Sequence, residues 1–268
     1  MDVIKAKVLE EKIQRVIAEG QGRVSLAIEL SECSIKHNSE VPLSAASLIK
    51  LPILLEGFYQ IQDGNLHPDE IIPVPQPEKV GGAGVLDLLS QHSNVTIHDL
   101  LTLMIIVSDN TATNLLIDRI GMIAVNEMCK RLGLKETQLN RKLMDLDALQ
   151  SGVDNQMSAR DALTCLKAID KDEMFHANSR ESMLKMLHNQ QFNQKLPAKI
   201  NRDHIYVANK TGELPGVEHD CAILRYKEHT VYASVLIVGL KDIHQGREMI
   251  IKIGEYLNEY IVNEYVLL

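Results

Sequence analysis

Apolar positions recur with helical spacing at the start of the chain and are followed by a short β-rich run. Residues 1–19 alternate charged residues with single apolar positions, which predicts an amphipathic helix that ends near Gly20. Residues 22–30 then contain the β-branched and small residues that are typical of a strand. The chain is therefore expected to begin with a helix and a strand.

Helical patterns dominate the middle of the chain. Residues 44–63 form a long apolar helix candidate. Thr96 with Asp99, and Ser158 with Asp161, form capping-box patterns, each directly before an apolar-periodic segment. We therefore expect a block of several helices between the first strand and the last part of the chain.

The pattern changes again after Pro197. Short β-rich segments follow one another, separated by turn-forming or charged residues, at 205–210, 221–226 and 230–240. Residues 246–262 then have the spacing of a final amphipathic helix. The order of helix, strands, helical block, strands and helix predicts an α/β (α+β) fold in which both chain ends build the same lobe.

This order also predicts where the lobes divide. We expect a discontinuous α/β lobe formed by residues 1–45 and 199–268, and a helical lobe formed by residues 46–198. With 268 residues, of which 45% are hydrophobic, the chain can bury a sizeable core.

Charge and hydropathy exclude several classes of function. The net charge of −8, without a basic stripe, argues against nucleic acid as a partner. The longest apolar runs, 231–240 and 100–107, are shorter than the roughly 20 residues that a bilayer requires, so no membrane span is expected. Residues 1–19 contain no uninterrupted apolar segment of a secretory signal, which predicts a cytoplasmic protein as the sequence is written. A leader missing from the written sequence would make it an exported protein.

Cysteine and histidine give no sign of a metal or a cofactor. Four cysteines occur without any C-x-x-C pair, and we expect them to be buried free thiols. Ten histidines occur without the spacing of metal ligands. The expectation is a protein with no metal and no cofactor that acts on a small molecule.

Three short motifs carry the candidate chemistry: Ser47-Leu48-Ile49-Lys50, Ser108-Asp109-Asn110 and Lys210-Thr211-Gly212. Each alone is weak, because the first is common on helices, the second is ordinary loop sequence, and the third fits a strand that leads into a turn. Together they stand at the start of a predicted helix, just after another helix, and at the end of a strand. This conjunction and order favour an active site.

The first motif has a direct chemical reading. Residues i and i+3 share a helix face, so the Lys50 amine can reach the Ser47 hydroxyl. A lysine with its reference pKa of about 10.4 is a poor base at neutral pH, and it must be desolvated or lie near other cations to accept a proton. The apolar neighbours Leu48, Ile49 and Leu51 favour such desolvation. The unpaired N–H groups at a helix start, that of Ser47 included, suit a developing oxyanion.

The three motifs closely resemble those of class A β-lactamases and penicillin-binding proteins. The similarity continues through residues 45–52 and 108–116 and, by order and spacing, spans nearly the whole chain. It implies a β-lactamase-like fold, with an antiparallel sheet flanked by the terminal helices, an inserted all-α lobe, and the active site between the two lobes.

The resemblance also implies the catalytic roles. Ser47 would be the acylated nucleophile, Lys50 would accept its proton, and Ser108 would carry a proton to the leaving nitrogen.

The remaining motif residues would bind substrate. Asn110 would hold the side-chain amide of the substrate, and Lys210 and Thr211 would meet its carboxylate. Gly212 would let the ligand approach the backbone closely. The backbone N–H of Glu213 would complete the oxyanion hole with that of Ser47.

One element of the family pattern is missing. In class A enzymes a loop carries a glutamate that activates the deacylating water, and the similarity places Leu143 at that position, within residues 140–158. Arg141 and Asp154 correspond to the ion pair that closes the loop, although the residues alone predict an exposed pair of little energetic value. Asp145 and Asp147 are nearby acids, but a shorter side chain displaced along the loop need not reach the acyl carbon.

We therefore expect a serine hydrolase that opens β-lactams through an acyl-serine intermediate, with slow or altered deacylation. The missing glutamate also leaves open a D-alanyl-D-alanine carboxypeptidase or an esterase, and a penicillin-binding sensor that does not turn over. A serine glutaminase of related fold fits the second and third motifs less well.

Overall fold

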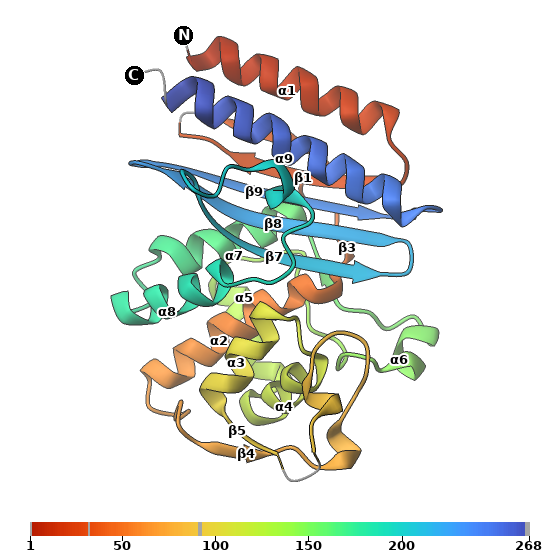
Figure 1. Ribbon diagram of the computed structural model, residues 1–268. Helices are drawn as coiled ribbons and strands as arrows, with labels where there is room; N and C mark the ends of the chain where they lie inside the picture. The colour runs from red at the N-terminus through yellow and green to blue at the C-terminus, as the bar shows by residue number, and fades with distance from the viewer. Residues whose placement is uncertain (1, 32, 91–92, 266–268) are drawn as a thin grey trace.

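The computed structural model describes residues 2–31, 33–90 and 93–265, and its centre is a five-stranded antiparallel sheet (Figure 1). In spatial order the strands are β2 (Ser34–His37), β1 (Arg23–Glu29), β9 (His229–Val238), β8 (Val217–Tyr226) and β7 (Tyr206–Leu214). The predicted α/β class with an antiparallel sheet is confirmed. Strand β7 lies at one edge of the sheet, which leaves one side of its backbone free of a neighbouring strand.

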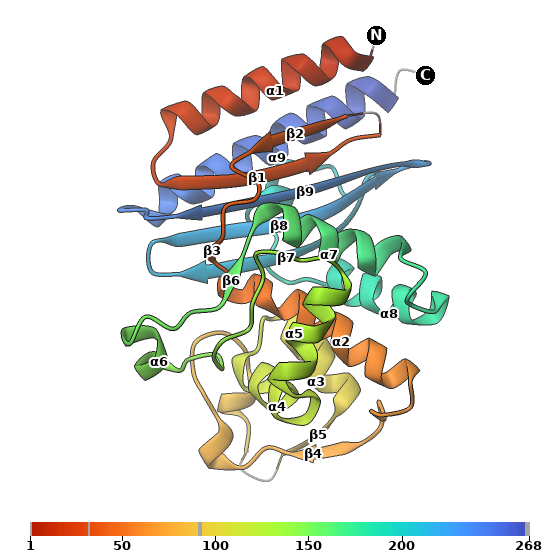
Figure 2. The same ribbon diagram turned by 180° about the vertical axis from the view of Figure 1, so that it is seen from behind.

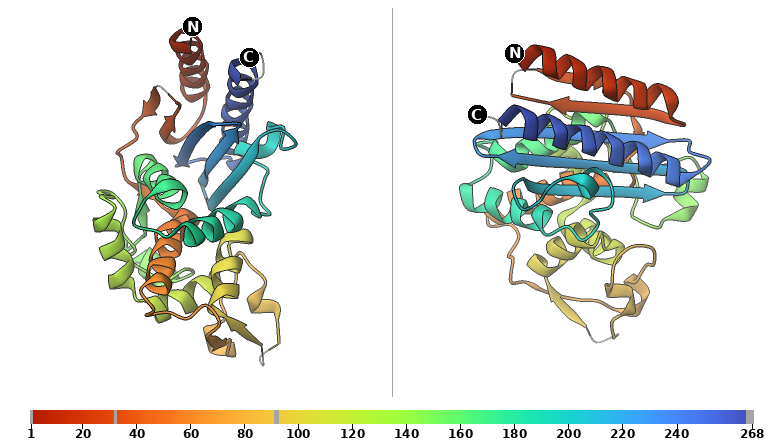
Figure 3. Two further views of the ribbon diagram at one scale, coloured as in Figure 1. Left: turned by 90° about the vertical axis from the view of Figure 1, so that its left-hand side faces the viewer. Right: turned by 45° about the horizontal axis from the view of Figure 1, so that its top comes forward.

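The two terminal helices cover one face of this sheet. Helices α1 (Asp2–Glu19) and α9 (Ile243–Tyr265) lie side by side along it (Figure 3). The side chains between them and the sheet form one apolar cluster that includes Ile13 of α1, Leu26 of β1 and Ile253 of α9. Residues far apart in the sequence thus share one core, as the repeated helix and strand patterns at both chain ends predicted.

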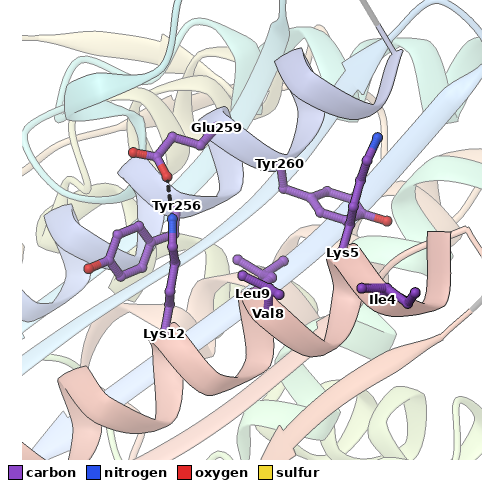
Figure 4. A pocket seen from close by; sticks show the side chains of 8 residues that line it. All are labelled: Ile4, Lys5, Val8, Leu9, Lys12, Tyr256, Glu259 and Tyr260. Atoms are coloured by element: carbon purple, nitrogen blue, oxygen red, sulfur yellow. Dashed lines mark hydrogen bonds and ion pairs between the residues drawn. The ribbon is translucent and has the colours of Figure 1, made fainter. Parts of the chain in front are cut away.

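A shallow pocket lies between the outer surfaces of α1 and α9, and Figure 4 shows its lining. Lys12 of α1 pairs there with Glu259 of α9 at 2.8 Å, and its amine also lies 4.8 Å from the ring centre of Tyr256. These contacts join the first helix to the last helix on the side of the molecule that faces away from the sheet.

Helices also cover the opposite face of the sheet (Figure 2). Helices α7 (Ala159–Lys171) and α8 (Ala177–His188) contact the sheet directly. The other helices described on this side are α2 (Lys50–Gln62), α3 (Ile97–Ile106), α4 (Asn110–Ile120), α5 (Met122–Arg131) and α6 (Leu146–Gln150). Helix α2 is buried on all sides from residue 50 to residue 58, because α3, α4, α5 and α7 surround it. Both faces of the sheet are therefore covered, which explains why β9 is an almost continuous apolar run.

Several local expectations were wrong. The helix predicted for residues 44–63 begins later, because Leu43–Ser44 form a short strand, β3, that pairs with β6 (Gln156–Met157). A 3-10 helix, η1 (Ala46–Ile49), then leads into α2. Strands β4 (Ile71–Pro73) and β5 (Asn94–Thr96) form a separate ribbon. Strands of two or three residues are too short to leave a periodic signal.

The third motif also lies differently in its strand. The β-rich segment was expected to end at Lys210, but β7 continues to Leu214, so Lys210, Thr211 and Gly212 lie inside the strand. The cause is the long β7–β8 hairpin, whose register pairs Leu214 with Val217. The division into lobes at residues 45/46 and 198/199 stays a prediction.

The cysteines lie mostly in the interior. Cys129, Cys165 and Cys221 are buried free thiols as predicted, whereas Cys33 is exposed, which corrects that expectation. Cys33 lies directly before β2, which is an edge strand of the sheet with a neighbouring strand on one side only. No helix within the described ranges has the length and apolar character needed to cross a bilayer.

Candidate active site

Ser47 and Lys50 lie together at the entry to helix α2, as predicted. Ser47 is the second residue of η1 and Lys50 the first of α2, and the Lys50 amine nitrogen lies 3.1 Å from the Ser47 hydroxyl oxygen. Lys50 is fully buried, whereas Ser47 is partly exposed. Ala46, just before Ser47, has a φ of 42°, a strained value for a residue with a side chain. The Ser47 hydroxyl is therefore accessible while the neighbouring Lys50 amine is shielded from water.

Ser108 joins this pair from the turn between α3 and α4. Its φ of 56° is in the left-handed region, and it lets both the carbonyl oxygen and the hydroxyl of the residue contact Lys50. The Lys50 amine lies 2.6 Å from the Ser108 carbonyl oxygen and 3.0 Å from its hydroxyl oxygen. Asn110 adds its side-chain oxygen at 2.9 Å from the same amine. The first and second motifs thus meet at one nitrogen.

The third motif reaches the same hydroxyl from the other side. Lys210 is fully buried on β7, and its amine lies 3.0 Å from the Ser108 hydroxyl oxygen and 2.8 Å from the Thr211 carbonyl oxygen. The structure therefore brings Ser47, Lys50, Ser108, Asn110 and Lys210 into one continuous set of hydrogen bonds.

Burial weakens both lysines as cations. Desolvation, followed by repulsion from Lys210, holds the pKa of Lys50 well below its usual value. Desolvation also lowers the pKa of Lys210 to about 7. A neutral Lys50 amine can donate to the Ser108 carbonyl and to the Asn110 side-chain oxygen, which leaves its lone pair for a serine hydroxyl. This arrangement makes Lys50 competent to accept the proton of Ser47.

Asp109, the middle residue of the second motif, organises one wall of the site. Its buried carboxylate accepts hydrogen bonds from the N–H of Ala112, as the cap of α4, and from the N–H groups of Val85 and Leu86. The adjacent Asn110 donates its side-chain amide to the Gly81 carbonyl at 3.1 Å. The segment 81–86 is therefore fixed to the Ser108–Asn110 turn.

The rest of the third motif lines the edge of β7. A side chain added at Gly212 would meet the Cβ of Ala46 at 3.3 Å, so glycine lets η1 pack closely against the strand. Thr211 is buried, whereas the Glu213 side chain is 53% exposed. The Glu213 carboxylate turns toward Lys195, 3.0 Å away, on the face of the sheet that α9 covers.

The predicted ion pair of the loop at residues 140–158 is present but not exposed. The Arg141 guanidinium lies 2.8 Å from the Asp154 carboxylate, and the two side chains are 6% and 21% exposed, which corrects the expectation of an exposed pair. The loop folds back on η1, and Asp154 also accepts a hydrogen bond of 2.5 Å from the Ser44 hydroxyl. Asn155 accepts one of 2.8 Å from the Ala45 N–H at its carbonyl. The loop is thus tied to the segment that leads into Ser47.

Leu143 occupies a firmly held position in that loop. Its N–H donates to the side-chain oxygen of Asn114 at 2.8 Å, and its carbonyl accepts from the amide nitrogen of the same side chain at 3.0 Å. The leucine side chain itself is buried. Asp145 caps helix α6 by accepting from the Ala148 N–H at 3.0 Å, and Asp147 is exposed in the first turn of α6. No contact in the described structure joins either acid to Ser47.

Sequence reasoning missed three residues that support the site: Asn114, Lys195 and His219. His219 donates from Nε2 to the Ser44 carbonyl at 2.8 Å and accepts the Ile237 N–H at Nδ1 at 3.1 Å. Burial lowers the pKa of His219 to about 4, so the neutral ring that these two bonds require is stable at neutral pH. Lys195 and His219 belong to no recognisable motif, and Asn114 lies in the similar segment 108–116 without being one of the three motifs' residues.

Among the described residues, no group of three or more His, Cys, Asp or Glu side chains is placed to hold a metal ion.

The chain is similar to several proteins of known structure. A β-lactamase from Sphaerobacter thermophilus is 28% identical, with a TM-score of 0.88 over 97% of each chain. PBP-A is 25% identical, with a TM-score of 0.87 over 95% of this chain and 96% of that chain. A search of curated proteins gave no match.

Two further structures extend the comparison. A leucine-to-glutamate mutant of PBP-A, solved as an acyl-enzyme complex with penicillin G, is 25% identical, with a TM-score of 0.86 over 96% of this chain and 97% of that chain. A variant of the class A β-lactamase of the last common ancestor of Gram-negative bacteria is 18% identical and shares the fold, with a TM-score of 0.87 over 96% of this chain and 100% of that chain. The family model of the β-lactamase enzymes matches residues 7–261, and the chain therefore belongs to this family of serine hydrolases.

Proposed function

We propose that the protein opens β-lactams by acylation of Ser47 and releases the acyl group slowly. The observation that carries this proposal is the buried Lys50 amine, which lies 3.1 Å from the Ser47 hydroxyl and 3.0 Å from the Ser108 hydroxyl. One amine in contact with both hydroxyls can serve the attack on the ring and the departure of its nitrogen.

Acylation begins with the neutral Lys50 amine. The Ser47 oxygen forms a bond to the lactam carbonyl carbon while its proton passes to the Lys50 nitrogen. Negative charge then develops on the carbonyl oxygen, and the backbone N–H groups of Ser47 and Glu213 stabilise it. Burial favours this step because it holds the pKa of Lys50 well below its usual value.

Departure of the ring nitrogen uses Ser108. When the tetrahedral intermediate collapses, the carbon–nitrogen bond breaks and the nitrogen takes the proton of the Ser108 hydroxyl. Ser108 regains a proton from the Lys50 ammonium, 3.0 Å away, so the amine becomes neutral again. Lys210, at 3.0 Å from the same hydroxyl, is positioned to attract the carboxylate of the substrate and to hold Ser108 in place.

Hydrolysis of the acyl group lacks an evident general base. A buried leucine is present at position 143. Asp145, the acid nearest to Leu143 along the sequence, uses its carboxylate to cap helix α6. Water is a weak nucleophile without a base, so a long-lived acyl-enzyme is expected. The likeness to PBP-A, whose leucine-to-glutamate mutant was solved as an acyl-enzyme with penicillin G, supports acylation at this serine.

The test combines two measurements on the same sample. Intact mass spectrometry of the protein with penicillin G should show one adduct on Ser47. The lifetime of this adduct should be much longer than the turnover time of an efficient β-lactamase. A chromogenic cephalosporin should give a burst of one equivalent followed by a slow steady state. Ser47→Ala should abolish the adduct, and Lys50→Ala should slow its formation by about a hundredfold or more. If Lys50→Ala were acylated at the wild-type rate, Lys50 would not be the base.

A carboxypeptidase or esterase remains the second candidate, and the missing base at Leu143 is what favours it. A peptide or ester leaving group would depart through the same Ser108 hydroxyl. Release of D-alanine from an acyl-D-alanyl-D-alanine peptide, together with a penicillin adduct that never turns over, would favour this candidate over the β-lactamase.

A further inference from the structure

Lys195 is a buried lysine that none of the three motifs contains. It lies just before the short helix η4 (Leu196–Lys199) and is 2% exposed. Its amine lies 2.5 Å from the Glu218 carboxylate and 3.0 Å from that of Glu213, so it forms an ion pair with two carboxylates. The same nitrogen lies 3.1 Å from the carbonyl oxygen of Gly212.

The Gly212 carbonyl belongs to the peptide group that supplies the Glu213 N–H. Gly212 pairs with His219 across the β7–β8 ladder, and the Lys195 amine also lies 3.1 Å from the His219 carbonyl oxygen. The Gly212 carbonyl therefore points inward, toward β8. In a trans peptide the C=O and the N–H point in opposite directions within one plane. The Glu213 N–H consequently points outward, to the free edge of β7.

That free edge faces the nucleophile. Strand β7 is the last strand of the sheet, and Gly212 packs against Ala46, the residue before Ser47. A donor that points outward at Glu213 is therefore directed to the side of the strand on which the acyl group must lie. The Lys195 ammonium contacts the carbonyl oxygen of the same peptide group.

We infer that Lys195 is a positioning residue for the oxyanion hole, which fixes the Gly212–Glu213 peptide plane and polarises it through the Gly212 carbonyl. This inference rests on the proposed function. A cation at a carbonyl oxygen draws electron density from the peptide nitrogen, and so makes its N–H a stronger donor to an oxyanion. Burial strengthens this effect, because the local dielectric constant is low there.

Other contacts hold the lysine in place. The backbone N–H of the next residue, Leu196, donates to the buried Asp220 carboxylate at 3.0 Å. Arg247 of α9 lies 3.1 Å from Glu218 and 3.6 Å from Glu213, the same two carboxylates that bind Lys195. No hydrogen bond in the described structure joins Arg247 to the Gly212 carbonyl. Arg247 is therefore a matched control, because removing it takes one positive charge from the same cluster and leaves the peptide contact intact.

The test compares Lys195→Met with Arg247→Gln. Two readouts follow the oxyanion hole: the rate of Ser47 acylation by penicillin G, and the infrared stretching frequency of the acyl carbonyl with a carbon-13 label. Loss of a whole oxyanion donor slows a reaction by about a hundredfold to a thousandfold, and we expect Lys195→Met, which only weakens one donor, to cost about tenfold. The acyl carbonyl should move to higher wavenumber. Arg247→Gln should leave the carbonyl frequency at the wild-type value.

Lys195→Met takes one of two cations from the buried Glu218 carboxylate and leaves it only Arg247, which destabilises the fold. The double variant Lys195→Met/Glu218→Gln also removes the negative charge that lost its partner, and it should recover thermal stability while the carbonyl frequency stays shifted. An unshifted carbonyl in both lysine variants, or an equal shift in Arg247→Gln, would overturn the role of Lys195 while the acyl-enzyme stands. Absence of any wild-type adduct would overturn the proposed function, and this inference with it.

Discussion

Lys50 and Lys210 share one hydroxyl: each amine nitrogen lies 3.0 Å from the Ser108 oxygen. Two amines that both contact one oxygen atom cannot both carry a proton without strong repulsion in a buried site. Desolvation and the charge of Lys210 both lower the pKa of Lys50, and desolvation lowers that of Lys210 to about 7. The protonation of either lysine is therefore tied to that of the other.

Lys210→Met should shift the pH profile of acylation. Below about pH 7 Lys210 is protonated and repels a proton on Lys50, so its removal should raise the pKa of Lys50. The acidic limb of acylation rate against pH should therefore move to higher pH. Stopped-flow acylation measured from pH 5 to 9 provides the test, with Lys142→Met, an exposed lysine paired with Asp118, as the control. A limb that stays in place, or moves to lower pH, would contradict the coupling.

The same substitution should stabilise the fold. The unfolded chain keeps Lys210 protonated up to its ordinary pKa, whereas the folded protein holds it protonated only below about pH 7. Wild-type stability from this group therefore rises with pH between these two values, and the full penalty of a buried charge applies below pH 7. Thermal unfolding should show a higher melting temperature for Lys210→Met at pH 6 than for the wild type. The gain should shrink toward pH 10, and a gain that grows with pH would reverse the sign of this argument.

The motif residues were predictable because their chemistry is carried by residue type and short spacing. Ser47 and Lys50 are one helical turn apart in any helix, so their contact follows from local geometry. Lys195 is different, because its contact with Gly212 depends on how the segment before η4 packs under the sheet. Asn114 similarly meets Leu143 only through the path of the loop. Contacts set by tertiary packing leave no periodic signal in the sequence.

The extent of β7 shows the same limit. The β-rich pattern predicts a strand that ends at Lys210, since Thr211, Gly212 and the following residues resemble a turn. Pairing with β8 extends the strand to Leu214. Long-range hydrogen bonds in the ladder therefore overrode the local preference of glycine for turns.

Two glycines of the segment 81–86 should respond differently to alanine. A Cβ at Gly84 would collide with the side chain and backbone of Asp109, and its φ of +118° is strained for alanine. Nothing lies within 4 Å of a Cβ at Gly81. Gly84→Ala should therefore cost about 2 kcal/mol or more of unfolding free energy and slow acylation, because Asp109 sets the Ser108 turn. Gly81→Ala should change stability by less than about 1 kcal/mol. Equal denaturant midpoints for the two variants would contradict this account.

Leu143→Glu tests whether the loop can regain its missing chemistry. The backbone of Leu143 is fixed by two hydrogen bonds to the Asn114 side chain, which a change of side chain at position 143 does not remove. The new carboxylate would stand on a loop tied to the segment before Ser47, and it would be available to activate a water for attack on the acyl group. A positioned general base contributes about a hundredfold or more, so the lifetime of the penicillin G adduct should shorten by about that factor. Intact mass spectrometry after a brief pulse of penicillin G measures this lifetime directly. Leu143→Gln has the same size without the charge, and it should leave the adduct as long-lived as in the wild type. If both variants keep the wild-type lifetime, the side chain at position 143 does not face the acyl carbon, and slow release has another cause.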